Sequence, residues 1–316
     1  MHGSAPPPSS GELESESRGL DPIRSPRGIW VCVNKEFIYH ENFVSALAAV
    51  RASKRQTIEL ERYEAKYLVP PSLVPAIREF IAPFCEPDEH APGTLPEYTI
   101  TTLQLDTPDL ALYYAKEYEA LARFKLRIRT YGLDRRVPVF VEIKRKIKGV
   151  IVKSRATIPV EHWGPDLITH PGRWVPFRSQ REAMNYLNFV RLVRELGARP
   201  VVLIRYDREA YLGRNDRYAR LTFDRRLRYC PTRGWNLWTD ERYFYKLDSS
   251  MVFGRAYSPV VLELKTFSDA PQWMVELTER FDLQRIGFSK YFAAMRVESL
   301  YRGAMYSDAS ENCTWW

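Results

Sequence analysis

The sequence predicts an α+β protein in which eight antiparallel strands close into a β-barrel, with helices packed outside it. Segments rich in β-branched and aromatic residues recur with period-two patterning. Several of them are joined by gaps of hairpin length, which favours antiparallel pairing. Charged residues also repeat on one face of successive strands. Such a face can point into a barrel only where the interior holds water, ions or a ligand, so we interpret the interior as a cationic tunnel.

The chain begins with two segments outside this predicted barrel. Residues 1–27 are rich in Pro, Ser, Gly and Glu and predict a disordered tail, because they have little apolar surface to bury. Residues 28–56 form an N-terminal extension with one strand-like and one short helical stretch. The predicted barrel domain covers residues 57–300, and residues 301–316 form a C-terminal tail.

Eight strands and four helices are predicted from residue 57 onward. The strands are expected at 57–68, 97–106, 123–131, 138–147, 150–161, 199–212, 217–224 and 259–267. The helices are expected at 72–84, 179–197, 271–283 and 287–300. Helices that lie between runs of strands, without a regular βαβ alternation, favour the α+β class.

Charge indicates the kind of partner. The 316 residues hold 47 Lys+Arg against 39 Asp+Glu, a net charge of +8, and this basic surplus favours an anionic partner. The four cysteines form no C-x-x-C pair, and no apolar run approaches the roughly 20 residues that cross a bilayer. We therefore expect a cytoplasmic protein with no membrane segment.

The cations gather on particular strand faces. In Arg123-Phe124-Lys125-Leu126-Arg127-Ile128-Arg129 every odd residue is cationic and every even residue is apolar, so the four cations share one face of a strand. Residues 123–155 hold 12 Lys+Arg against 2 Asp+Glu. Same-face charges recur at Arg62, Glu64 and Lys66, at Glu142, Lys144 and Lys146, at Lys153 and Arg155, and at Glu263 and Lys265.

Two less specific interpretations compete with a tunnel. One isolated strand of this kind is usually a solvated sheet face, but like charges on neighbouring strands repel, and their repetition favours a bound polyanion. An open sheet that binds nucleic acid would interleave its cations with aromatic stacking residues. The alternate face here carries Phe124, Leu126 and Ile128, which suits a core, so no nucleic acid is expected.

Eight short motifs, in order, carry a resemblance to a known family. They are Arg62-Tyr63-Glu64-Ala65-Lys66-Tyr67, LQLDT at 103–107, KLRIRTY at 125–131, VEIKRK at 141–146, YDREAY at 206–211, RLTFD at 220–224, LELK at 262–265 and FSKY at 288–291. Their order and spacing resemble the catalytic domain of the vacuolar transporter chaperone (VTC) family, the polyphosphate-polymerase branch of the triphosphate tunnel metalloenzymes. The resemblance implies an eight-stranded antiparallel barrel.

The resemblance also implies roles for individual residues. The catalytic cations would be Lys66, Arg127, Arg129, Lys144 and Lys290. A second, substrate-binding group would be Arg62, Lys153, Arg155, Arg208, Arg220 and Lys265. Glu263 would be the metal-binding carboxylate, with Glu64 or Glu142 as a further ligand, and the ion would be Mn²⁺ or Mg²⁺. Arg62 stands where tunnel triphosphatases carry the first glutamate of their E-x-E-x-K strand.

The activity that the resemblance implies is synthesis of polyphosphate from ATP. The expected partners are ATP, inorganic polyphosphate, and pyrophosphate or phosphate. Two alternatives stay open, namely a non-catalytic module that binds polyphosphate or nucleotide, and a tunnel triphosphatase. The chain has no Walker A, G-x-G-x-x-G or H-E-x-x-H motif, so P-loop, dinucleotide-binding and zincin chemistry is not indicated. We expect a stand-alone catalytic domain.

Overall fold

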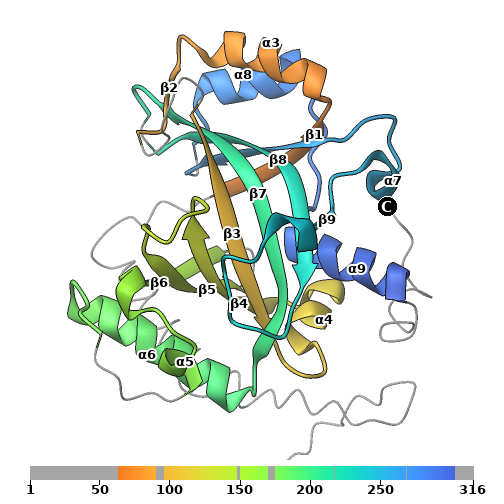
Figure 1. Cartoon of the computed structure of the whole chain (residues 1–316). Helices are drawn as coiled ribbons and strands as arrows, with labels where there is room; N and C mark the ends of the chain where they lie inside the picture. The colour runs from red at the N-terminus through yellow and green to blue at the C-terminus, as the bar shows by residue number, and fades with distance from the viewer. Residues whose placement is uncertain are drawn as a thin grey trace, which may run out of the picture. The chain divides into compact units, whose positions relative to one another are not determined.

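One antiparallel sheet organises the protein (Figure 1). The computed structural model describes residues 63–89, 96–147, 150–169, 175–216, 218–267 and 269–302. Eight strands follow the spatial order β1-β10-β8-β7-β3-β4-β5-β6, while the short strands β2 and β9 pair with β7 and β8. The strands are β1 (Tyr63–Val69), β2 (Cys85–Pro87), β3 (Glu97–Asp106), β4 (Ala122–Tyr131), β5 (Val139–Ile147), β6 (Val150–Ile158), β7 (Arg199–Gly213), β8 (Arg220–Pro231), β9 (Tyr245–Lys246) and β10 (Val260–Thr266).

Helices lie against both faces of this sheet (Figure 1). They are α3 (Val74–Ile81), α4 (Ala111–Glu117), α5 (Asp166–Thr169), α6 (Gln180–Glu195), α7 (Ser250–Phe253), α8 (Gln272–Arg280) and α9 (Lys290–Arg302). Three single-turn 3₁₀ helices are η1 (Pro71–Leu73), η2 (Val160–His162) and η3 (Glu241–Tyr243). None of the described helices is long and apolar enough to span a membrane.

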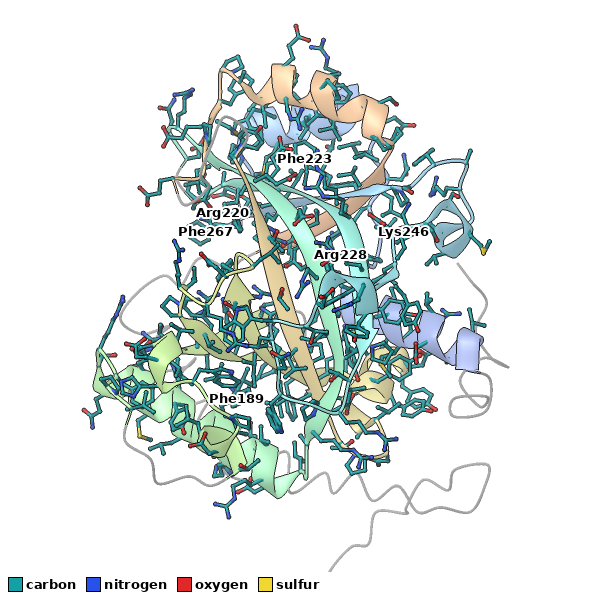
Figure 2. All side chains as sticks on the ribbon, viewed as in Figure 1. Phe189, Arg220, Phe223, Arg228, Lys246 and Phe267 are labelled. Atoms are coloured by element: carbon teal, nitrogen blue, oxygen red, sulfur yellow. The ribbon has the colours of Figure 1, made fainter. Side chains whose placement is uncertain are left out.

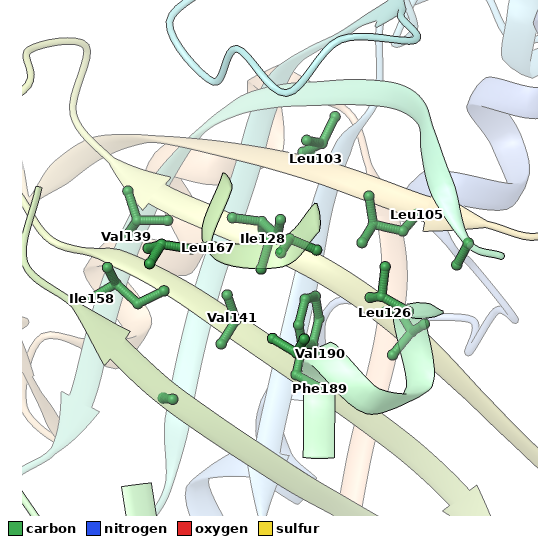
Figure 3. Packing of buried hydrophobic residues seen from close by; sticks show 14 of the residues in the cluster. Leu103, Leu105, Leu126, Ile128, Val139, Val141, Ile158, Leu167, Phe189 and Val190 are labelled. Atoms are coloured by element: carbon green, nitrogen blue, oxygen red, sulfur yellow. The ribbon is translucent and has the colours of Figure 1, made fainter. Parts of the chain in front are cut away.

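Two apolar clusters cover the sheet face that the even residues of β4 form, which we call the outer face. Leu126 and Ile128 are fully buried there against Phe189 and Val190 of α6 (Figure 3). At the β1 end of the sheet, a second cluster joins β1, β8 and β10 to α3 and α8. Burial of these alternate residues explains why the strands show period-two patterning.

The opposite, inner face carries a third apolar cluster over part of its area. Ile100 of β3, Tyr206 of β7 and Val261 of β10 pack there against residues of α4 and α9. Asp106 fixes these two helices, because its carboxylate accepts hydrogen bonds from the backbone N–H of Leu112 and from the Tyr291 hydroxyl. The first turn of α9 therefore lies beside the charged remainder of the inner face.

The prediction of a closed barrel is not confirmed. The α+β class and the antiparallel order of eight strands agree with the structure, but the described parts of β1 and β6 share no backbone hydrogen bonds, so the sheet path stays open. The open edge of β6 has a physical advantage, because Lys153 and Arg155 stay 40% and 32% exposed and so carry a smaller desolvation penalty.

One strand is longer than predicted because a β-bulge interrupts its alternation. The segment 217–224 was expected as a strand, and β8 instead runs to Pro231. Arg205 pairs with Arg228 and Asp207 with Arg225, so two residues of β8 face one residue of β7. The predicted tails, the extension 28–56, the first part of strand 57–68 and Arg62 lie outside the described residues.

Candidate functional site

The inner face brings together charged residues from seven of the eight strands of the main path, all except β3. Strand register places Lys66 opposite Glu263, Arg208 opposite Asp224, and Glu142 between Arg127 and Arg155. Because side chains of paired residues lie on the same side of a sheet, these groups share one surface. The members are Glu64, Lys66, Lys125, Arg127, Arg129, Glu142, Lys144, Lys153, Arg155, Arg208, Arg220, Asp224, Glu263 and Lys265, with Lys290 added by α9. We call this set the tunnel face.

Glu142 is the hub of one half of the tunnel face. Its fully buried carboxylate accepts hydrogen bonds from Arg127 Nε and Arg155 Nε, both at 2.6 Å. Lys153 Nζ lies 2.9 Å and Arg129 Nη1 4.0 Å from the same carboxylate. Burial alone would raise the pKa of Glu142, but the surrounding cations, Arg129 foremost, hold it far below its usual range. Glu142 thus acts as the shared counter-ion of four cations.

Glu64 bridges the open seam between the two ends of the sheet. Lys144 Nζ of β5 lies 3.3 Å from Glu64 Oε2 of β1, and Lys66 Nζ lies 3.1 Å from Glu64 Oε1. The first strand of the path, β1, and its next-to-last strand, β5, therefore face each other across an interior, although their described residues form no backbone ladder. Burial and Glu263 act to raise the pKa of Glu64, but lysines, Lys144 first, lower it to about 2.

Asp224 joins strand β8 to the start of helix α9. Its buried carboxylate accepts two hydrogen bonds from Arg208, at 2.6 and 2.8 Å, and one from Lys290 Nζ at 2.5 Å. Burial opposes ionisation of Asp224, yet Arg208 and Lys290 hold its pKa at about 2. The ring of Tyr206 lies beneath the Lys290 ammonium at 4.3 Å. Two cations are thereby fixed at the junction of the sheet and α9.

Lys125 is a cation of the tunnel face without a carboxylate partner among the described residues. Its ammonium donates to Ser289 Oγ at 2.7 Å. Burial lowers the pKa of Lys125 well below the usual lysine value, and nearby Lys66 and Lys144 add to the effect. Nearby, Lys66 Nζ donates to the carbonyl oxygen of Phe288 at 3.1 Å. The segment just before α9 thus contributes oxygen acceptors to a crowded group of ammonium ions.

Three further groups titrate near neutral pH. Burial lowers the pKa of Lys144 to about 8, with Arg127 adding to the effect and Glu64 opposing it. Burial likewise lowers the pKa of Lys153 to about 8, although Glu142 opposes the change. Burial would raise the pKa of Tyr131, but nearby arginines outweigh it and lower this pKa to about 8. The charge of the tunnel face therefore changes with pH over a physiological range.

Glu263 and Glu64 are the carboxylates best suited to a divalent cation. Glu263 is buried, lies 2.6 Å from Lys265 Nζ and 3.6 Å from Arg208 Nη2, and repels Glu64 electrostatically. A buried and a partly buried carboxylate that interact electrostatically fit an ion that takes its remaining ligands from phosphate oxygens and water. Glu142 fits less well, because each of its two oxygens already accepts a hydrogen bond from an arginine Nε. In the described part of the chain, no three Asp, Glu, His or Cys side chains form a metal-binding group by themselves.

The predicted site residues fall into a buried group and a more exposed group. Arg220 and Lys153 are the most exposed, with 45% and 40% of their side chains accessible, and Arg220 pairs with Asp88 at 3.2 Å. Arg127, Arg129, Arg208 and Lys290 are mostly buried. We infer that the exposed cations lie at openings of the tunnel face.

Sequence reasoning did not assign roles to four residues of this site. Asp224 and Tyr206 were inside quoted motifs, and Ser289 precedes the predicted Lys290. Lys125 was on the same predicted strand face as Arg127. For Lys125 the alternation was sufficient signal, whereas the role of Asp224 depends on a long-range contact with α9.

Comparison with known proteins gives one family match. The sequence model of the VTC domain family matches residues 61–299. No curated protein matches the chain. Among solved structures, the PH1819 protein of Pyrococcus horikoshii OT3 is 11% identical, with a TM-score of 0.37 over 75% of this chain and 99% of that one. The Mimivirus capping enzyme triphosphatase is 12% identical, with a TM-score of 0.29 over 78% and 98% of the two chains.

Proposed function

Because the chain belongs to the VTC domain family, we propose that it is a polyphosphate polymerase that uses a divalent metal ion. The terminal oxygen of a polyphosphate chain would attack the γ-phosphorus of ATP, the bond to the β,γ-bridging oxygen would break, and ADP would leave. The tunnel face supports binding of such a chain. Its cations clearly outnumber its four carboxylates, and Lys125 has no acidic partner among the described residues. A bound polyanion would remove this imbalance.

The ionisation of the carboxylates supports transfer to phosphate over hydrolysis. Each of the four carboxylates of the tunnel face is paired with cations, and each has a lowered pKa. A carboxylate in this state is a weak general base for an attacking water. A terminal phosphate oxygen is largely ionised at neutral pH and needs no base. This pairing is the observation that carries the proposal of a polymerase.

We assign distinct roles to cations of different geometry. Arg127, Arg129 and Arg208 would hold phosphate oxygens through paired N–H groups, because the planar guanidinium matches phosphate. Lys66 and Lys290 would supply point charge toward the transferred group, where charge spreads over the phosphoryl oxygens. With a polyanion bound, Lys144 and Lys153 would stay protonated, since added negative charge raises a lysine pKa.

Glu263, with Glu64, would hold the divalent ion. Such an ion neutralises charge on phosphate oxygens and orients them for in-line attack. The lysines that now pair with these carboxylates, Lys265 and Lys66, would turn to the substrate. Glu142 has no part in metal binding in this proposal, because its oxygens already accept from arginines on β4 and β6.

The test is to incubate the purified protein with ATP and Mn²⁺, with and without a short polyphosphate primer, and to resolve the products on a polyphosphate gel. Formation of a polymer that requires the metal is the expected result. Free phosphate as the dominant product under all conditions would make the protein a triphosphatase. Tight polyphosphate binding without turnover would indicate a binding module.

A Glu263→Gln variant separates catalysis from binding. Transfer should be lost, since the metal site loses a charge, while nucleotide binding should weaken less because the cations remain. Thermal unfolding of the variant controls for loss of fold. Full activity of Glu263→Gln would contradict the assigned metal site.

A further inference from the structure

A cavity of about 420 Å³ lies away from the tunnel face, on the outer face of the sheet. Its walls come from α3 and the turn before it, from β8, from β9 and its flanks, and from the segment that runs from Ser258 to the first residue of β10, Val260. Figure 2 labels two of its basic residues, Arg228 and Lys246. The volume falls in the range of small-molecule sites.

The bulge in β8 directs three arginines toward this cavity. Strict alternation would place Arg225 and Arg228 on opposite faces, but Arg226 and Leu227 together face one residue of β7. Arg225, Arg226 and Arg228 therefore all line the cavity. Arg226 adopts a φ of 49°, a left-handed conformation that residues other than glycine rarely adopt. Bulges and such conformations recur next to functional sites.

Carboxylates beneath these arginines fix their orientation. Arg226 Nε donates to Asp207 at 2.7 Å, and Arg228 Nη1 donates to the same carboxylate at 3.2 Å. Arg78 of α3 donates two hydrogen bonds to the buried Glu209, at 2.5 and 2.8 Å. The guanidinium groups are thus held in place before any ligand arrives, which lowers the entropy lost on binding.

Lys246 adds a cation that interacts electrostatically with Asp248 but makes no direct ion pair in the described part of the chain. It lies directly opposite Arg228 in the β8–β9 ladder, an unfavourable like-charge pair. The exposed ammonium of Lys246 forms no ion pair or hydrogen bond with any residue in the described ranges. Arg228 already pairs with Asp207 and Glu241, so an anion here would chiefly add a direct partner for the Lys246 ammonium.

Asp248 supplies the cavity with a hydrogen-bond acceptor, in contrast to the cationic donors around it. Its side chain is 5% exposed and lines the cavity, and its Oδ2 accepts from the backbone N–H of Leu227 at 2.9 Å. Its Oδ1 has no hydrogen-bond partner among the described residues. A buried polar atom left unpaired is costly, so this oxygen would favour a ligand hydroxyl or amino group.

The remaining wall is apolar. Pro71, Val74 and Pro75 lie on the α3 side, and Pro259 and Val260 lie just before and at the start of β10. A plain phosphate chain would use neither this wall nor the acceptor of Asp248. We propose that the cavity binds a phosphate ester of a small organic group, of the nucleoside phosphate class, at a site separate from the tunnel face.

The test uses ADP as the probe in isothermal titration of the full chain. We expect two classes of ADP site in the unchanged protein. Lys246→Glu should weaken one class at least tenfold, and Lys66→Glu should weaken the other. Arg194→Glu, an equal charge reversal at an exposed residue of α6, is the control and should change neither class. The melting temperature of Lys246→Glu controls for loss of fold, because the new acid faces Arg228 but also lies near Asp248.

Asp248→Asn and pyrophosphate test the ligand class. The amide can still accept from Leu227 N–H, but the cavity loses its anionic acceptor, so ADP should bind severalfold more weakly there while pyrophosphate binding stays unchanged. A single ADP class that Lys66→Glu abolishes and Lys246→Glu leaves intact would overturn the second site. Pyrophosphate that binds the cavity as tightly as ADP would overturn the organic ligand. These outcomes do not depend on turnover, so they are independent of the proposed polymerase activity.

Discussion

At the scale of single residues, Glu142 holds the tunnel face together in the absence of a substrate. Four cations converge on its carboxylate, and each would otherwise repel the other three across the β4, β5 and β6 strands. A buried charge with several partners contributes little net stability, but its loss leaves the partners unpaired. Glu142 therefore differs from Glu263, whose proposed role requires a ligand.

Glu142→Gln should lower the free energy of unfolding by roughly 3 kcal/mol in the absence of ligand, because it leaves a buried group of like charges uncompensated. Tripolyphosphate should restore much of this loss by supplying the missing negative charge. Denaturant unfolding with and without tripolyphosphate measures both effects. Glu161→Gln, at an exposed position, is the control. Equal stability of Glu142→Gln and the unchanged protein would mean that the four cations find other partners.

Lys125→Met should have the reverse effect on stability. Lys125 is a buried cation that bonds only to a hydroxyl among the described residues, and its burial already disfavours its charged form. The methionine side chain has a similar length and carries no charge, so the ligand-free protein should melt at a higher temperature. Affinity for tripolyphosphate should fall. A lower melting temperature together with unchanged affinity would mean that Lys125 serves packing alone.

At the scale of elements, alternation predicted the long strands because each buries one face under helices. The predicted segments 97–106 and 123–131 match β3 and β4 closely. The end of β8 was missed because Arg225 and Arg226 are consecutive charges, and the bulge at Arg226 and Leu227 interrupts the period-two signal. Helix α4 was missed because it is short and begins after Leu110, whose φ of 59° is unusual for leucine.

The site was predictable where its chemistry lies along one strand. The alternating cations of β4 indicated a shared charged face, and register brings them beside Glu142. The contacts of Lys290 with Asp224 and of Lys125 with Ser289 join elements far apart in sequence, and no local pattern specifies such distances. Whether the sheet closes depends on pairing between its two edge strands, β1 and β6. The alternation of residues within one strand carries no information about that pairing.

The paired strands β5 and β6 should make substrate affinity depend on pH. In the ligand-free protein Lys144 and Lys153 have a pKa of about 8, below the ordinary 10.5. They lose charge as pH rises from 7 to 9, and a bound polyanion must restore it, so tripolyphosphate affinity should fall at least roughly tenfold. The same shift makes the ligand-free protein gain stability between about pH 8 and 10.5, where the unfolded chain binds more protons.

Titration calorimetry of the unchanged protein at pH 7 and 9, beside the Lys144→Arg/Lys153→Arg double variant, measures this dependence. Arginine keeps its charge over the whole range, so the double variant should lose much less affinity. Its comparison with the unchanged protein also removes the titration of tripolyphosphate itself. Identical pH profiles for both proteins would show that these lysines stay charged in the ligand-free state.

At the scale of the whole molecule, the sheet ends at a seam that side chains bridge and backbones do not. Amides on the outer edges of β1 and β6 should therefore exchange hydrogen faster than those of β7 and β3, which pair on both sides. Hydrogen exchange read by mass spectrometry on peptides from these strands tests this prediction. Equal protection of β6 and β7 would show that the barrel closes in solution.

Because cations outnumber carboxylates on the tunnel face, small anions bound there can be exchanged for a polyanion. Without a phosphate chain, the cations of the tunnel face attract small anions from the solution, and each of these anions binds independently of the others. A chain of linked phosphates displaces several such ions at once, and their release adds entropy that a single phosphate cannot provide. The covalent linkage between phosphates therefore makes the site selective for long chains. This selectivity should weaken as the salt concentration is raised.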